Sequence, residues 1–131
     1  SDDERELGVA MLDIGGGTSD LALYQNGNIR HTYVLPVAGN HFTNDVAVGL
    51  RTTLKDAERV KKEYGLACID LMDHDRVLEV QTVHGDETQL INQSDLIAIL
   101  QPRSQELLSL IHEEIIKHKL EPMMASGLVL T

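Results

Sequence analysis

The sequence predicts an α/β fold that combines a three-stranded antiparallel meander with helices and a smaller α+β region. The first supporting observation is an opening block of apolar segments separated by turn residues, with the hairpin dipeptide Asn26-Gly27 between two of them. The second is a set of helix-periodic segments after residue 40, interrupted by a short hairpin pattern near residue 84. A mixed sheet accompanied by helices is therefore expected.

Three strands are expected at the start of the chain. Residues 8–14 (GVAMLDI) are apolar on both alternating faces except at Asp13, which predicts a strand covered on both sides. Residues 20–25 and 28–37 predict the second and third strands, and Asn26-Gly27 favours a tight turn between them. The meander thus contains one glycine-rich bend and one short bend.

The middle of the chain predicts two helices and a hairpin. Residues 41–50 form the first helix, with Asn40 or Thr43 as its cap, and residues 53–64 form the second, which ends at Gly65. Residues 68–76 are predicted to be a loop. Residues 77–83 and 88–91 then bracket a turn and predict a hairpin.

The last third predicts helical structure around a proline. Ser94 is expected to cap a helix that reaches Pro102, and this proline either kinks the helix or separates it from a second one over residues 103–119. That second segment carries one apolar stripe, formed by Leu107, Leu108, Ile111 and Ile115. Residues 128–130 resemble the beginning of a buried strand, and we expect the chain to be a fragment of a longer protein.

The composition argues against several functional classes. A length of 131 residues suffices for one compact domain or two small subdomains. A net charge of -10, with three Tyr, one Phe and no Trp, argues against a nucleic-acid partner. The single cysteine, Cys68, cannot form an internal disulfide and is expected to be an inert thiol in a reducing compartment. No segment has the pattern of a membrane span or a signal peptide.

The chemistry is expected in the glycine loop that follows the first strand, residues 13–18 (DIGGGT). Consecutive glycines allow positive φ angles and let several amides approach one anion. A carboxylate at the edge of such a loop suits a phosphate neutralised by magnesium, which is held through its own waters. Because a strand and not a helix follows, neither a dinucleotide fingerprint nor a Walker loop is expected. An Asp at the end of a doubly buried strand would also be costly without a partner.

Residues 13–20 (DIGGGTSD) resemble the second phosphate motif of the actin, sugar-kinase and heat-shock-chaperone superfamily. Residues 28–54 (NIRHTYVLPVAGNHFTNDVAVGLRTTL), residues 56–65 and the later ILQPRSQELLSLI resemble the FtsA family of bacterial cell-division proteins. The resemblance covers nearly the whole chain. It implies the second half of an actin-like, ribonuclease H-like ATPase fold, with an inner subdomain over residues 8–50 and 103–131 and an outer one over residues 51–102.

The resemblance also implies ATP and Mg²⁺ as cofactors. Asp13 would orient Mg²⁺ through water, and the β- and γ-phosphates would be held by Gly15, Gly16, Gly17 and Thr18. The outer subdomain would contact ribose and adenine through Glu58, Lys61 and Lys62. Residues 127–131 resemble the start of an adenosine motif. Without the rest of the cleft, this fragment is expected to bind ATP weakly and not to hydrolyse it.

The implied partners are the tail of the tubulin-like protein FtsZ, further copies in actin-like polymers, and other division proteins. The parent would tie FtsZ to the cytoplasmic face of the bacterial membrane at the septum, through a terminal amphipathic helix outside this sequence. Arg103 would pair with a carboxylate of the FtsZ tail. Two alternatives stay open: a nucleotide-bound scaffold without turnover, and a pilus-assembly or chaperone-like member of the same superfamily.

Other polar groups have simpler interpretations. Glu58, Lys61 and Lys62 also fit a solvated helix face with an ion pair three residues apart, and Arg103 also fits an ordinary surface position. The segment from His112 to His118 lacks zinc spacing because position 116 is Ile. The acidic loop at residues 70–75 lacks the glycine turn and terminal Glu of a calcium site. No metal is predicted at either place.

Overall fold

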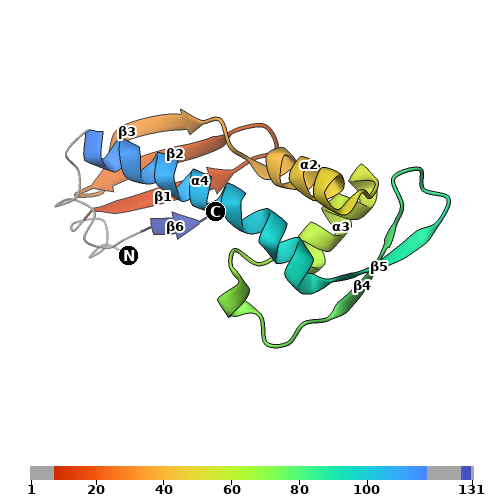
Figure 1. Cartoon of the computed structure of the whole chain (residues 1–131). Helices are drawn as coiled ribbons and strands as arrows, with labels where there is room; N and C mark the ends of the chain where they lie inside the picture. The colour runs from red at the N-terminus through yellow and green to blue at the C-terminus, as the bar shows by residue number, and fades with distance from the viewer. Residues whose placement is uncertain (1–7, 118–127, 131) are drawn as a thin grey trace. The chain divides into compact units, whose positions relative to one another are not determined.

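The computed structural model describes residues 8–117 and 128–130. In chain order, the elements are β1 (Val9–Ile14), β2 (Ser19–Gln25), β3 (Asn28–Leu35), α2 (Gly39–Leu50), α3 (Leu54–Tyr64), the 3₁₀ helix η1 (Ile69–Leu71), β4 (Val77–Gln81), β5 (Thr88–Asn92), α4 (Gln93–Lys117) and β6 (Leu128–Leu130) (Figure 1). They form two compact units. The first comprises the described residues up to Gly39 and those from Glu106 onward, and the second spans Asn40–Gln105.

The first unit contains a four-stranded mixed sheet in the order β3-β2-β1-β6. β1, β2 and β3 pair antiparallel, so the predicted meander is confirmed. β6 pairs parallel with β1, which confirms a strand at residues 128–130, but its Leu130 is 63% exposed instead of buried. The turn between β2 and β3 is formed by Asn26 and Gly27, which have φ angles of 55° and 78°. Positive φ at both positions is what a tight turn between twisted strands requires.

One face of this sheet forms the core of the first unit. The buried side chains alternate along the strands and are Ala10, Leu12, Ser19, Leu21, Leu23 and Leu35. Tyr33 lies on the same face. Burial, and secondarily the charge of Glu114 on α4, raise the pKa of Tyr33, which places this part of α4 near β3. Leu107 and Ile111 of the predicted apolar stripe are buried, whereas Leu108 is 56% exposed.

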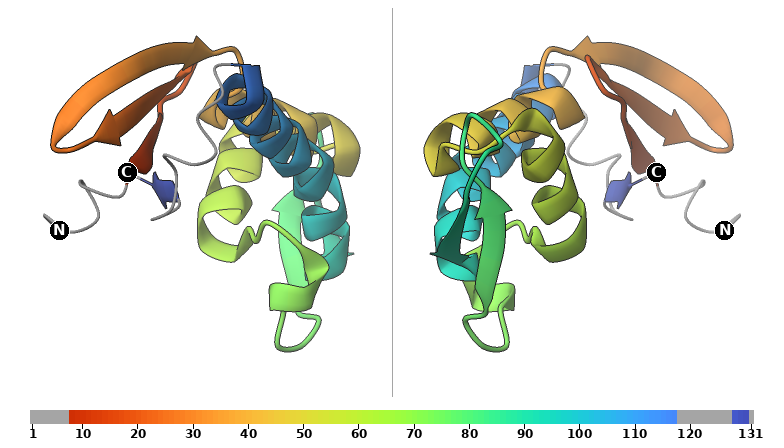
Figure 2. Two further views of the ribbon diagram at one scale, coloured as in Figure 1. Left: turned by 90° about the vertical axis from the view of Figure 1, so that its left-hand side faces the viewer. Right: turned by 90° about the vertical axis from the view of Figure 1, so that its right-hand side faces the viewer.

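The second unit has its own apolar cluster. Its buried members come from α2, α3, β4 and α4, and are Val46, Leu50, Ala57, Val60, Leu78, Val80, Leu96 and Leu100. The β4–β5 hairpin runs beside α3 and the first half of α4 (Figure 2). Two polar side chains of α3 bind the backbone along the outer edge of β4. The backbone amide of Gln81 donates to Asp56 Oδ2 (2.7 Å), and Arg59 Nη2 donates to the Glu79 carbonyl (2.8 Å). These bonds satisfy backbone groups that a strand edge leaves open.

The predicted helix ends are partly wrong. α2 begins at Gly39, so Asn40 and Thr43 lie inside it and neither is its cap. Thr53, expected as the first residue of the second helix, is instead the cap of α3, since its side chain accepts the Asp56 amide. Gly65 ends α3 with φ of -71°, outside the left-handed region. Glycine is required there because a β-carbon would lie 2.3 Å from the Lys61 carbonyl oxygen.

α4 differs from its prediction at its start, and its course decides between the two alternatives left open at Pro102. It begins at Gln93, and Ser94 donates its amide (2.9 Å) and its hydroxyl (2.7 Å) to the carboxylate of Asp75, which therefore replaces Ser94 as the capping group. The helix continues through Pro102, so of the two alternatives left open at this proline the separate second helix is wrong. Ala98, whose carbonyl loses its donor to this proline, is exposed, so water can serve that oxygen.

The unit boundaries also differ from those expected. Residues 40–50 were assigned to the inner subdomain, but Val46 and Leu50 of α2 belong to the apolar cluster of the second unit. The boundary within α4 lies at 105/106 instead of 102/103. The roles of the units as inner and outer subdomains stay a prediction. No helix in the described ranges combines the length and the apolar character needed to cross a membrane.

Candidate functional site

The glycine loop joins β1 to β2 as a tight turn. The Gly15 amide donates to the Thr18 carbonyl (3.0 Å), and the Gly15 carbonyl accepts from the Gly39 amide (2.9 Å). A β-carbon on Gly15 would lie 2.8 Å from the Thr18 oxygen, whereas one on Gly17 would meet nothing within 4 Å. Neither these two glycines nor Gly16 has a positive φ angle, so that part of the prediction is wrong. These glycines matter because they lack a β-carbon: at Gly15 this lets the turn close, and at Gly17 it leaves the surface open to a ligand.

Three successive amides of this loop are available to a ligand. Those of Gly16, Gly17 and Thr18 donate no hydrogen bond within the part of the chain that the structure describes. All three residues are exposed, and two of them have no β-carbon to keep an anion away. Consecutive backbone donors at a bend form an anion-binding nest. The loop therefore fits a phosphate group.

Two carboxylates stand beside this loop. Asp13 on β1 is the cross-strand partner of Asp20 on β2, so the two side chains lie on the same face of the sheet. Both residues are exposed, so the expected burial of Asp13 is wrong and the cost of burying it is no argument for function. Like charges directly opposite each other repel, and a bound cation would remove that repulsion.

The carboxylate pair suits a cation that takes its other ligands from water and phosphate. The described residues include no group of three or more His, Cys, Asp or Glu that could hold a metal ion. Mg²⁺ commonly binds to one or two carboxylates together with substrate phosphates. Asp20 was missed from the sequence, although a signal existed: a four-residue turn at 15–18 places residue 20 opposite residue 13.

In the second unit, α3 gathers the other predicted ligand residues. Lys61 Nζ lies 2.9 Å from Glu58 Oε2, and Lys62 Nζ lies 3.3 Å from Glu58 Oε1. Thr43 on α2, which was predicted only as a cap, donates its hydroxyl to Glu58 and accepts from Lys61 Nζ (2.9 Å). The Thr43 hydrogen bond, then that of Lys61, lowers the pKa of Glu58 to about 2. The structure brings these groups together in an ion-pair network.

Arg103 is engaged within the second unit. Its Nε and Nη2 atoms each donate to Asp45 on α2 at 2.8 Å, in a two-pronged contact. The side chains of Arg103 and Asp45 are 26% and 30% exposed. The pair joins α4 to α2, so the arginine has a structural function. Its contact with a partner stays a prediction.

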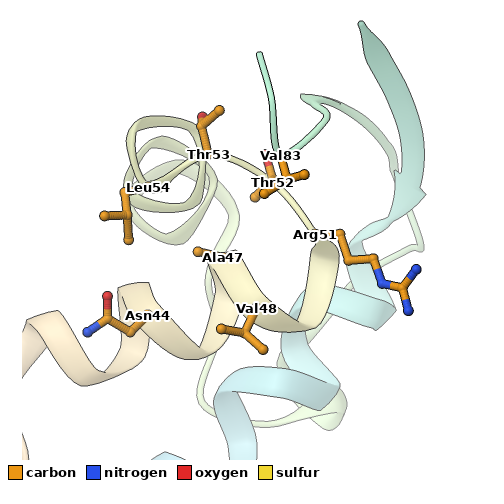
Figure 3. A pocket seen from close by; sticks show the side chains of 8 residues that line it. All are labelled: Asn44, Ala47, Val48, Arg51, Thr52, Thr53, Leu54 and Val83. Atoms are coloured by element: carbon orange, nitrogen blue, oxygen red, sulfur yellow. The ribbon is translucent and has the colours of Figure 1, made fainter. Parts of the chain in front are cut away.

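A cavity of about 540 Å³ lies where α2 ends and α3 begins (Figure 3). Its lining is largely apolar, and Val48, Leu54 and Val83 in it are 79%, 60% and 57% exposed. Arg51 is the one charged residue among the eight that line it, and its side chain points away from the others (Figure 3). No predicted ligand residue lines this cavity, so it is not the candidate nucleotide site.

Comparison with known proteins identifies the family. The family model described as "Cell division protein FtsA" matches residues 10–127. The FtsA protein of Escherichia coli K12 is 41% identical over the whole of this chain and 33% of its own length. That of Bacillus subtilis strain 168 is 40% identical over 88% of this chain and 26% of its own length. The chain thus spans about a third or less of these relatives.

Solved structures show the fold. MreB5 of Spiroplasma citri bound to ADP has a TM-score of 0.78 and 24% identity, and the match covers 99% of this chain and 43% of MreB5. The PilM-PilN type IV pilus biogenesis complex has a TM-score of 0.66 and 18% identity, with 98% and 30% covered. The MamK filament has a TM-score of 0.68 and 12% identity, with 93% and 40% covered. The predicted actin-like fold is confirmed.

The pilus-assembly alternative shares this fold at 18% identity, whereas the FtsA proteins share the sequence at about 40%. Identity at that level over most of the chain, together with the family match, decides between the two interpretations. The chain belongs to the FtsA family of cell division proteins.

Proposed function

We propose that residues 13–20 bind the terminal phosphates of ATP together with Mg²⁺. The observation that carries the proposal is the row of amides at Gly16, Gly17 and Thr18, three exposed residues whose amides have no acceptor in the described part of the chain. They lie beside the facing carboxylates of Asp13 and Asp20. Donors alone would fit any anion. Donors next to paired carboxylates fit an anion that arrives with a cation.

Each group has a defined part in this proposal. Gly15 shapes the turn, and Gly16, Gly17 and Thr18 donate to the β- and γ-phosphate oxygens. Asp13 and Asp20 would hold Mg²⁺ through water. When bound, Mg²⁺ would neutralise phosphate charge and favour transfer of the terminal phosphoryl group. The bound ADP of the structurally similar MreB5 supports a nucleotide as the ligand.

Glu58, Lys61 and Lys62 are proposed to contact the ribose and adenine. Glu58 is ionised at neutral pH, as any glutamate with a pKa below 5 is, so its carboxylate can accept hydrogen bonds from ribose hydroxyls. The side chain of Lys61 is 20% exposed, and that of Lys62 is 70% exposed. Lys62 is therefore the better candidate for a direct contact, and Lys61 for holding Glu58 in place.

Calorimetry on this chain tests the nucleotide proposal. Mg²⁺ with ATP is expected to bind weakly, because the loop is exposed and much of the ligand would stay in water. Asp13→Asn should abolish the Mg²⁺-dependent part of the heat. Asp73→Asn, which neutralises an exposed acid of the second unit, should leave it unchanged. Equal binding by all three proteins would contradict the assignment.

For the parent protein, we propose an actin-like adaptor of bacterial division that self-associates and links FtsZ to the cytoplasmic face of the membrane at the septum. Membership in the FtsA family supports this role, and the filament formed by the structurally similar MamK supports self-association. Turnover distinguishes a cycling ATPase from a nucleotide-bound scaffold. If the full-length protein releases phosphate and Asp13→Asn abolishes that release, the ATPase is favoured. Assembly without release in either protein would favour the scaffold.

Arg103 is proposed to hold a carboxylate of the FtsZ tail. In its pair with Asp45, the Arg103 guanidinium already makes the two parallel hydrogen bonds by which an arginine binds a carboxylate. A carboxylate of the tail would therefore have to displace Asp45. Replacing Arg103 by Glu should weaken tail binding in a titration. Because this change also sets two acids against each other, Asp45→Asn is the control for loss of the internal pair. Equal tail affinity in both variants would remove Arg103 from the interface.

A further inference from the structure

Ser19 is a buried polar residue at the foot of the glycine loop. Its side chain is 0% exposed, and its hydroxyl donates to the Val37 carbonyl at 2.6 Å. Val37 is 2% exposed and lies beyond the end of β3, so its carbonyl is outside the sheet ladder. A buried carbonyl in that position needs a donor, and Ser19 supplies one across 18 positions of sequence.

A second hydrogen bond ties the same segment to the other end of the loop. The Gly39 amide donates to the Gly15 carbonyl at 2.9 Å. Gly15 is the first glycine of the loop, and Ser19 directly follows its last residue, Thr18. Residues 37–39, with the fully buried Ala38 at their centre, are thus bonded to both ends of the loop. We call this pair of bonds the 37–39 clamp.

The first glycine of the loop is fully bonded, whereas the amides that follow it are not. Both backbone polar groups of Gly15 are bonded inside the protein: its amide donates to the Thr18 carbonyl, and its carbonyl accepts from the Gly39 amide. The next three amides have no acceptor among the described residues. Donors held in place before a ligand arrives bind it more tightly, because no ordering cost is incurred on binding.

From this arrangement, we propose that Ser19 is a positioning residue of the phosphate loop. Its hydroxyl holds residues 37–39 against the loop base, which keeps the amides of Gly16–Thr18 gathered for the phosphates. The inference rests on the proposed phosphate binding for its purpose, but the clamp itself can be measured without any nucleotide. The competing explanation is that Ser19 only satisfies a buried carbonyl and stabilises its unit in a general way.

A matched control separates these two explanations. In the second unit, the Thr52 hydroxyl donates to the Gln81 carbonyl at 2.5 Å, and Thr52 is 2% exposed. Ser19→Ala and Thr52→Ala therefore each remove one buried hydroxyl-to-carbonyl bond, and both should lower Tm by a few degrees. Ser19→Thr keeps the hydroxyl and serves as the rescue variant. Should Ser19→Ala not fold, Ser19→Cys has a similar volume and a weaker donor, and replaces it.

Amide hydrogen exchange without ligand tests the clamp directly. In Ser19→Ala, the Gly15 and Gly39 amides should exchange roughly tenfold faster than in the wild type, as expected when a net hydrogen bond of the usual strength is lost. Thr52→Ala should leave both amides protected, and Ser19→Thr should restore protection. Unchanged exchange in Ser19→Ala, or equal loosening in Thr52→Ala, would overturn the proposal.

Binding of Mg²⁺ with inorganic pyrophosphate tests the purpose of the clamp. Ser19→Ala should raise the Kd by roughly fivefold to tenfold, while Thr52→Ala and Ser19→Thr should stay near the wild-type value. If the wild type binds and Ser19→Ala binds equally well, the positioning role is wrong and the phosphate site stands. If the wild type binds neither pyrophosphate nor ATP, the proposed function is wrong, and the exchange data alone decide whether the clamp exists.

Discussion

Gly15 and Gly17 are two positions apart in one loop but differ in what a side chain would meet. A β-carbon on Gly15 would press on the Thr18 carbonyl at 2.8 Å, and one on Gly17 would enter open space. Gly15→Ala should therefore lower the free energy of unfolding by ~1–2 kcal/mol, because the backbone must shift. Gly17→Ala should cost little stability but weaken phosphate binding. Urea unfolding measures the first effect; equal losses in both variants would contradict it.

Removing one charge of the Asp13–Asp20 pair should stabilise the free protein but weaken its binding of Mg²⁺ with ATP. Without a cation, the facing carboxylates repel each other, so Asp20→Asn should raise the free energy of unfolding by a few tenths of a kcal/mol. With Mg²⁺ and ATP, the same change should weaken binding, because the ion loses one carboxylate. Thermal unfolding with and without ligand measures both effects. A variant that is destabilised in the free state would show that the two charges do not interact unfavourably.

At the scale of the elements, the stability contributed by the contact between α2 and α3 should decrease at low pH. The pKa of Glu58 is lowered from 4.5 to about 2 by Thr43 and then by Lys61, so its contacts contribute fully above about pH 5. As the pH falls from 5 to 2, the unfolded chain takes up the proton first and that contribution is lost. The side chain is 38% exposed, so solvent screening limits the loss to about 1 kcal/mol.

Urea unfolding at pH 6, 4 and 3 measures this dependence. The wild type should lose more stability over this range than Glu58→Gln. The control is Glu79→Gln, since Glu79 is exposed and its side chain makes no ion pair among the described residues. Its acid dependence should match that of the wild type. Identical curves for all three proteins would show that Glu58 does not link α2 and α3.

Elements whose cause is local were predictable from the sequence. The Asn26-Gly27 turn and the three strands around it follow from positive-φ preference and apolar patterning, and both are present. The start of α4 was missed because its capping carboxylate, Asp75, is 19 positions away in sequence. Gly65 was identified as a helix end, but for a reason that only the distance to the Lys61 carbonyl reveals.

The same distinction applies to the candidate site. The glycine loop and Asp13 could be identified from one contiguous segment. The roles of Thr43 and Asp45 could not, because each depends on which residue of another helix lies opposite it. The burial expected for Asp13 was wrong, since an apolar segment does not reveal where a strand leaves the core.

At the scale of the whole molecule, the chain contains two units that each carry part of the proposed ligand set. The phosphate loop and its carboxylates belong to the first, and Glu58, Lys61 and Lys62 belong to the second. The predicted inner subdomain extended to residue 50 and so included α2. The apolar side chains Val46 and Leu50 place α2 in the second unit instead.

The central claim is that free loop amides receive the phosphates of a nucleotide. An NMR titration of ¹⁵N-labelled chain with Mg²⁺ and ATP tests it most directly. We predict that the amide signals of Gly16, Gly17 and Thr18 shift first and furthest, and that Asp13→Asn removes these shifts. Shifts confined to the second unit, with the loop signals unmoved at saturating nucleotide, would contradict the claim.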